Sequence, residues 1–127
     1  MEKAIGIYDS GVGGLSVLRE LVKLLPHHNF LYYADTAHMP YGERSPQEIV
    51  AFSNHIIDFL SRQGAAMIVV ACNTSSAIAV PALASRVSLP LLGMIEPAVS
   101  AARAYKSLGL MATAATVASG AYARMVI

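Results

Sequence analysis

The sequence is poor in the residues that mark several large classes of protein. It holds a single cysteine, Cys72, which excludes an internal disulfide framework and suits a reducing compartment. Only 13% of the residues are charged and the formal net charge is +1, so there is no electrostatic case for binding nucleic acid or an acidic membrane. No uninterrupted apolar run is long enough to span a membrane, and the first residues lack the apolar core of a signal peptide. These absences predict a soluble, cytoplasmic protein.

The sequence does contain short apolar runs that alternate with amphipathic stretches. The apolar runs predict strands at residues 4–8, 30–34, 66–71, 89–95 and 107–112. The stretches between them predict helices at 15–25, 45–63, 77–86 and 96–105, with another helix beginning after 113. Ser45, Pro46 and Glu48 form a strong helix start, with a cap, a first-turn proline and a capping box. The alternation predicts an α/β fold, a doubly wound parallel sheet flanked by helices.

The stretch from Ala66 to Ser76 changes character within one residue. Its apolar strand runs into Cys72, and four residues that favour helix N-caps follow, from Asn73 onward. The thiol is therefore expected at the carboxyl end of a strand and the amino end of a helix, where open α/β sheets bind ligands and where an anion is favoured. A lone cysteine is also often a small core residue, so both interpretations stay open from this stretch alone.

Two other predicted strands end in polar groups at the same edge of the sheet. Asp9 and Ser10 follow the first strand, and Asp35 opens the loop after the second. Acid, hydroxyl, amide and thiol groups that converge in this way indicate a functional site. Asp9 could also be only a turn former and Ser10 only a helix cap. The glycines that follow fit neither a dinucleotide-binding motif nor a P-loop, and Asp9 would repel a phosphate, which places a nucleotide- or flavin-binding module last.

The four histidines show no metal-ligand pattern. No two of them have convincing spacing, so we expect no metal site. Only His38 lies in a loop that could approach Cys72, which leaves a Cys–His hydrolase as a minor alternative.

Five segments, taken in order, resemble the motifs of bacterial glutamate racemases in the aspartate/glutamate racemase superfamily. They are IYDSGVGGLSVL at 7–18, YAD at 33–35 with PYG at 40–42, VACNTSS at 70–76, GMIEP at 93–97 and ATAATVASGAY at 112–122. The resemblance covers essentially the whole chain. Five motifs in order are far more specific than any one of them.

The resemblance implies an isomerase that interconverts L- and D-glutamate without a cofactor and supplies D-glutamate for peptidoglycan. Such enzymes use two cysteines, one from each of two similar α/β domains, on opposite sides of the substrate α-carbon. One thiolate removes the α-proton and the other thiol delivers a proton to the opposite face. By this match the catalytic residues are Cys72, the first of the pair, and Asp9, which would assist by handling a proton or contacting the substrate ammonium. The substrate-binding residues that the match implies are Ser10, Tyr41, Gly42, Asn73, Thr74 and Thr116, with Thr113 as a further contact.

The sequence also departs from the family pattern. Family members carry their second cysteine in a Cys-Thr-His motif that these 127 residues do not contain. We therefore expect a truncated form that is inactive alone, with a first racemase domain at 1–95 and the incomplete start of a second at 96–127. The expected partner is glutamate, with no nucleic acid, no membrane and a homodimer as the candidate assembly. The alternatives are an aspartate or hydantoin racemase and a non-catalytic truncated interaction module.

Overall fold

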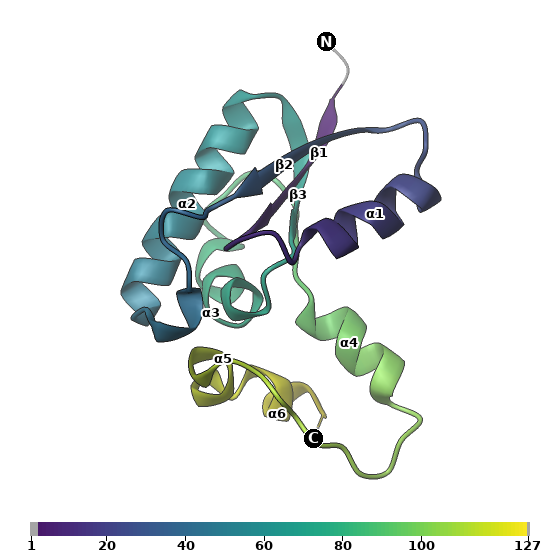
Figure 1. The fold of residues 1–127 in the computed structure, drawn as a ribbon, viewed down its shortest axis with the longest axis vertical. Helices are drawn as coiled ribbons and strands as arrows, with labels where there is room; N and C mark the ends of the chain where they lie inside the picture. Colours follow the sequence, from purple (N-terminus) through teal and green to yellow (C-terminus); the bar gives the residue numbers. More distant parts are fainter. Residues whose placement is uncertain (1–2, 127) are drawn as a thin grey trace.

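The computed structural model describes residues 3–126, and within them four strands form one parallel sheet flanked by helices (Figure 1). The strands are β1 (Ala4–Asp9), β2 (Asn29–Ala34), β3 (Ala65–Val70) and β4 (Leu91–Leu92), paired in the order β2-β1-β3-β4. In the centre of the sheet, Ile7 of β1 lies opposite Tyr32 of β2 and Val69 of β3. The predicted α/β class and the parallel sheet are confirmed.

Helices cover both faces of the sheet because β1 and β3 are apolar on both sides. On one face, Ile7 and Val69 pack against α1 (Leu15–Leu24). On the other face, Tyr8 and Val70 pack against α2 (Pro46–Arg62) and α3 (Asn73–Leu83). Near-continuous apolar strands of this kind are typical of parallel sheets that are buried on both faces.

The start of α2 is as the sequence predicts. The Ser45 hydroxyl accepts a hydrogen bond from the Glu48 N–H at 3.2 Å, and the Glu48 carboxylate accepts one from the Ser45 N–H at 2.9 Å. Pro46 occupies the first helical position, where its missing N–H costs nothing. The hydrogen bond from the Ser45 N–H lowers the pKa of Glu48, because it favours the carboxylate form.

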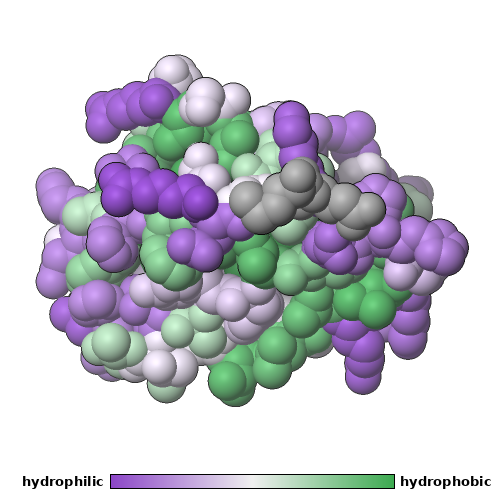
Figure 2. Space-filling view, turned by 90° about the horizontal axis from the view of Figure 1, so that it is seen from above, coloured by the Kyte–Doolittle hydropathy of each residue, from purple (hydrophilic) through white to green (hydrophobic). Residues whose placement is uncertain are grey.

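Four short helical segments lie beyond the carboxyl ends of the strands. They are η1 (Tyr41–Glu43), α4 (Ile95–Ala102), α5 (Ala114–Ser119) and α6 (Ala121–Val126). Figure 1 shows α4, α5 and α6 together below the sheet, where α5 contacts α3 and η1 while α6 contacts α4. Figure 2 views the opposite end, above the amino ends of the strands, where many hydrophilic side chains project between apolar patches. In the described part of the chain, no helix combines the length and the apolar character that crossing a membrane requires.

The prediction of a fifth strand at 107–112 is wrong. These residues form an irregular loop, in which Met111 is 99% exposed. A strand needs a neighbour that offers free N–H and C=O groups, whereas α4 carries the chain away from the sheet before this segment begins (Figure 1). The predicted strand at 89–95 is also too long, since pairing is confined to Leu91–Leu92 and α4 starts at Ile95.

Candidate active site

The strand order places a crevice at the carboxyl ends of β1 and β3. β2 pairs with β1 on one side, whereas β3 pairs with β1 on the other side. The winding direction of the sheet therefore reverses between β1 and β3. Open α/β sheets bind ligands at such a switch point. Asp9 ends β1, and Cys72 follows β3 by two residues, so the two predicted catalytic residues lie at this end of the sheet.

Asp9 organises the glycine-rich turn that follows β1. Its Oδ2 accepts hydrogen bonds from the N–H groups of Gly11 at 3.2 Å and Gly14 at 3.0 Å. The Tyr32 hydroxyl donates to the Gly11 carbonyl at 3.0 Å and holds the same turn from β2. Burial raises the pKa of Tyr32, and the nearby charges of Asp9 and Cys72 raise it further. The turn-forming role of Asp9 is thus confirmed, and Ser10 lies partly exposed in that turn.

Cys72 is both buried and placed at a helix N-terminus. It is 6% exposed, and its Sγ accepts a hydrogen bond from the Ser75 N–H at 3.5 Å, which makes Cys72 itself the N-cap of α3. The expectation that the cap lies among the four residues after Cys72 is wrong, because α3 already begins at Asn73. Cys72 is therefore a buried residue and also a thiol at the edge of the sheet, so the two interpretations of this residue are compatible.

Three threonine hydroxyls form a closed hydrogen-bonded cluster beside the start of α3. Thr74 Oγ1 lies 2.8 Å from Thr113 Oγ1, Thr113 Oγ1 lies 2.8 Å from Thr116 Oγ1, and the Thr116 hydroxyl donates to Thr74 Oγ1 at 3.2 Å. Thr113 also caps α5, since its Oγ1 accepts from the Thr116 N–H at 3.3 Å. This cluster, called the threonine cluster below, fastens α5 to α3 and brings two predicted substrate-binding residues together.

Gly42 lies directly against the threonine cluster. A Cβ atom on Gly42 would come within 2.7 Å of Thr113 Cβ and 2.9 Å of Thr113 Cγ2, closer than any real side chain approaches. Only glycine therefore fits at this position while the loop stays where it is. The close approach brings the backbone of η1 next to Thr113, which is hydrogen-bonded to Thr74 and Thr116.

Tyr41 and Asn73, two further predicted site residues, are each held by a side-chain hydrogen bond. Tyr41 is 1% exposed and donates its hydroxyl hydrogen bond to Asp35 Oδ2. Burial raises the pKa of Tyr41, and the hydrogen bond to Asp35 raises it further. The hydroxyl of Tyr122 in α6 donates to Asn73 Oδ1 at 2.5 Å. Both hydroxyls are thus committed to protein partners.

An open groove with a volume of about 640 Å³ runs past the ends of β1 and β3. Its lining residues are Asp9, Gly13, Gly14, Ser16, Val17, Ala71, Asn73, Met94, Pro97 and Ala98. Of the predicted site residues, Asp9 and Asn73 thus face one groove. Cys72, Thr74 and Thr116 are buried and do not line it. Among residues 3–126 no cluster of three histidine, cysteine or acidic side chains could hold a metal ion.

The sequence model of the Asp/Glu/hydantoin racemases matches residues 5–127. The chain belongs to this racemase family. A glutamate racemase of Thermus thermophilus is 52% identical over 122 residues, which are 96% of this chain and 48% of that protein. The chain thus spans about half the length of the curated relatives it matches.

Solved racemase structures share the fold throughout the chain. The glutamate racemase of Thermus thermophilus in complex with β-chloro-D-alanine superposes with a TM-score of 0.93 at 51% identity, covering 98% of this chain and 49% of that one. The glutamate racemase of Francisella tularensis in complex with D-glutamate gives a TM-score of 0.91 at 36% identity, covering 98% and 48%. The racemase fold of this chain therefore corresponds to half of each solved enzyme.

Sequence reasoning assigned no role to two residues that support the site. Asp35 and Tyr122 are hydrogen-bonded to Tyr41 and Asn73, but Asp35 was only placed at the sheet edge and Tyr122 was given no part in the site. A signal for Asp35 exists, because an acid at the end of β2 lies at the same sheet edge as Asp9. Nothing in the local pattern connects Tyr122 to Asn73, since they lie 49 residues apart.

Proposed function

We propose that this chain is part of a cofactor-independent glutamate racemase that interconverts L- and D-glutamate for peptidoglycan synthesis. The observation that carries the proposal is the placement of Cys72, which caps α3 at the sheet's switch point, at the same sheet edge as Asp9, in a chain of the racemase family. The names of the relatives support glutamate in particular, since several proteins that match across the chain are glutamate racemases.

In the proposed reaction the Cys72 thiolate takes the proton from the substrate α-carbon. The electron pair of the broken C–H bond stays on the α-carbon and spreads into the carboxylate, and a second thiol then gives its proton to the opposite face. Cys72 ends the turnover as a thiol and the second residue as a thiolate, so the reverse reaction restores both. A thiolate is a usable base near neutral pH, which suits this step.

The α-proton of an amino acid is weakly acidic, so the carbanion-like state needs fixed hydrogen-bond donors. We propose that Asn73 supplies one donor at the substrate carboxylate and that the threonine hydroxyls supply others by exchanging hydrogen bonds within their cluster for bonds to the substrate, with Ser10 and the backbone at Gly42 closing the site. The N-terminus of α3 adds partial positive charge at the same place. Asp9 would receive the substrate ammonium or assist Cys72, although one of its oxygens already holds the turn.

The second acid/base is not among these 127 residues, because Cys72 is the only cysteine. We therefore propose that the 127-residue polypeptide does not racemise glutamate by itself. We also propose that residues 1–95 form one racemase domain and that 96–127 begin a second, which the position of α4, α5 and α6 beyond the sheet supports. We propose a reducing, cytoplasmic setting, which suits the free thiol. Assembly as a homodimer stays a prediction.

The test is racemisation of D-glutamate, followed by circular dichroism, with an enzyme that joins these residues to a racemase second half. Cys72→Ser keeps an N-cap acceptor for the Ser75 N–H but replaces the thiolate with a poor base, so we expect activity to fall by about 10²–10⁴-fold with little loss of stability. Full activity in Cys72→Ser, or sustained racemisation by the 127-residue polypeptide alone, would contradict the mechanism. A faster reaction with aspartate or a hydantoin than with glutamate would reassign the substrate within the family.

A further inference from the structure

Asp35 joins two strands to the loop that carries Tyr41 and Gly42. Its backbone N–H donates to the Asp9 carbonyl at 3.0 Å, which fixes Asp35 at the end of β1. Its carboxylate is 5% exposed and accepts from the Tyr41 hydroxyl at Oδ2. The His38 Nδ1 lies 2.8 Å from Oδ1 and 2.9 Å from Oδ2 of the same carboxylate. A buried carboxylate with two donors from one loop holds that loop firmly, because charge-assisted hydrogen bonds are the strong ones.

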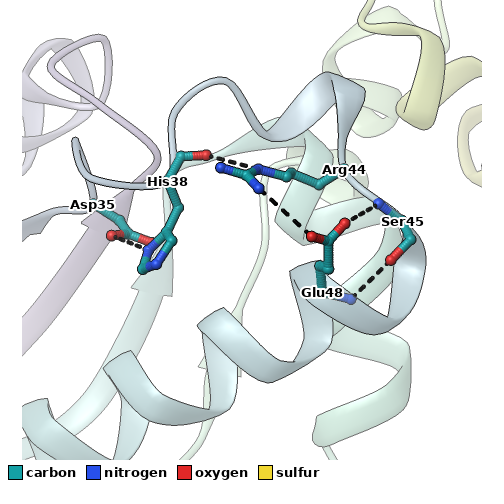
Figure 3. A network of polar contacts seen from close by, with 5 residues as sticks. All are labelled: Asp35, His38, Arg44, Ser45 and Glu48. Atoms are coloured by element: carbon teal, nitrogen blue, oxygen red, sulfur yellow. Dashed lines mark hydrogen bonds and ion pairs between the residues drawn. The ribbon is translucent and has the colours of Figure 1, made fainter.

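The other contacts of this loop are more exposed. Figure 3 shows Arg44 reaching from the loop to the His38 carbonyl, at 3.2 Å, and to Glu48, at 3.5 Å. The His38 ring stacks on Phe52 at a centroid distance of 4.0 Å. Surface ion pairs contribute little to stability, so we take the contacts of the buried Asp35 carboxylate as the main anchor of the loop.

The anchored loop places Gly42 against the threonine cluster. The Tyr41 side chain points inward to Asp35, and the next residue along the loop, Gly42, lies against Thr113. A Cβ on Gly42 has no room beside Thr113, so the loop cannot move inward. If the Asp35 contacts were lost, the loop could only move outward, away from Thr74 and Thr116.

We propose that Asp35 is a positioning residue of the racemase site, which sets the backbone of Tyr41 and Gly42 against the threonine cluster. This inference rests on the proposed function, because the backbone it positions is the part of the loop expected to bind glutamate. Asp35 itself takes no part in proton transfer.

The test is Asp35→Asn in the enzyme that carries both halves. The asparagine keeps the shape, but it is neutral and replaces one acceptor oxygen with an NH₂ donor, so the hydrogen bonds from Tyr41 and His38 are no longer charge-assisted. We expect KM for glutamate to rise about ten-fold, as for loss of one charge-assisted hydrogen bond, while kcat changes by less than about three-fold. The matched control is Asp58→Asn on the exposed face of α2, where Asp58 pairs with Arg62 at 2.7 Å, and we expect KM within about two-fold of wild type.

A double-mutant cycle separates positioning from general destabilisation. Tyr41→Phe removes the same hydrogen bond from its other side, so we expect the double variant with Asp35→Asn to raise KM no further than the more damaging single variant. Effects on KM that multiply, or an Asp35→Asn enzyme that behaves like the Asp58→Asn control, would overturn the proposal.

Hydrogen exchange of the loop amides at 36–44, measured without substrate, gives a readout that does not depend on activity. We expect faster exchange in Asp35→Asn and unchanged exchange in Asp58→Asn. Unchanged exchange in Asp35→Asn would overturn the anchor. If the wild-type enzyme failed to racemise glutamate, the proposed function would fail, whereas faster exchange would still support Asp35 as the anchor of the loop.

Discussion

Gly14 is the position at which one added methyl group should disturb the candidate site most directly. A Cβ atom there would lie 2.7 Å from Asp9 Cβ, 2.8 Å from Tyr32 Oη and 3.0 Å from Ala71 Cβ. Non-bonded carbon atoms prefer about 3.5–4.0 Å, so all three contacts are clashes. The Tyr32 hydroxyl is the end of a side chain and can move, but the Cβ atoms of Asp9 and Ala71 are fixed to the ends of neighbouring strands. Gly14→Ala must therefore shift the backbone between β1 and the residues after β3.

The cost follows from two effects. Overpacking a closely packed site costs about 1–3 kcal/mol. The shift also distorts the 3.0 Å hydrogen bond from the Gly14 N–H to Asp9 Oδ2, which is worth about another 1 kcal/mol. We expect Gly14→Ala to lower the free energy of unfolding by about 2–4 kcal/mol and, in the enzyme that carries both halves, to reduce the proposed racemase activity, because Asp9 is displaced.

The assay is urea unfolding followed by far-UV circular dichroism. Gly13→Ala is the matched control in the same turn, because the nearest atom to its added Cβ is Asp9 Oδ2 at an ordinary 3.7 Å. We expect the control to stay within about 0.5 kcal/mol of wild type. The reasoning would be refuted if Gly14→Ala were as stable as the control, or if both substitutions destabilised the protein equally.

Two further predictions concern tyrosine hydroxyls. Tyr122→Phe removes the 2.5 Å hydrogen bond that holds the Asn73 amide. In the enzyme that carries both halves we expect KM for glutamate to rise about three-fold to ten-fold with less than about 1.5 kcal/mol of lost stability, and unchanged kinetics would contradict this role of Tyr122. Burial raises the pKa of Tyr41 above its usual value near 10, so the stability that depends on the protonated phenol is complete below about pH 10 and falls as the pH rises further. The free energy of unfolding, measured with urea at about pH 8 and about pH 11, should fall less in Tyr41→Phe than in wild type. The expected difference is about 1.4 kcal/mol per pH unit above 10. Equal losses in the two proteins would show that Tyr41 ionises freely in the folded protein.

The sequence was sufficient where structure depends on neighbours along the chain. Local patterns predict the capping box at Ser45, the apolar runs of β1 and β3, and the position of Cys72 between a strand and a helix. The predicted strand at 107–112 shows the limit of the same reasoning. Apolar alternation made that segment suitable for a strand, but strand formation also needs a partner, which the path of α4 removes.

Only the tertiary structure decided how the candidate site is supported. The bond from Tyr122 to Asn73 joins residues 49 positions apart, and the threonine cluster joins Thr74 to Thr113 across 39. Asp35 could be placed at the correct edge from sequence, but its bond to Tyr41 depends on the fold of the loop that returns to it. Local patterns determined which groups reach the edge of the sheet, because they follow from periodicity and caps. Helix packing decides which hydroxyls and carboxylates hold those groups in place, because it brings distant segments within hydrogen-bond distance.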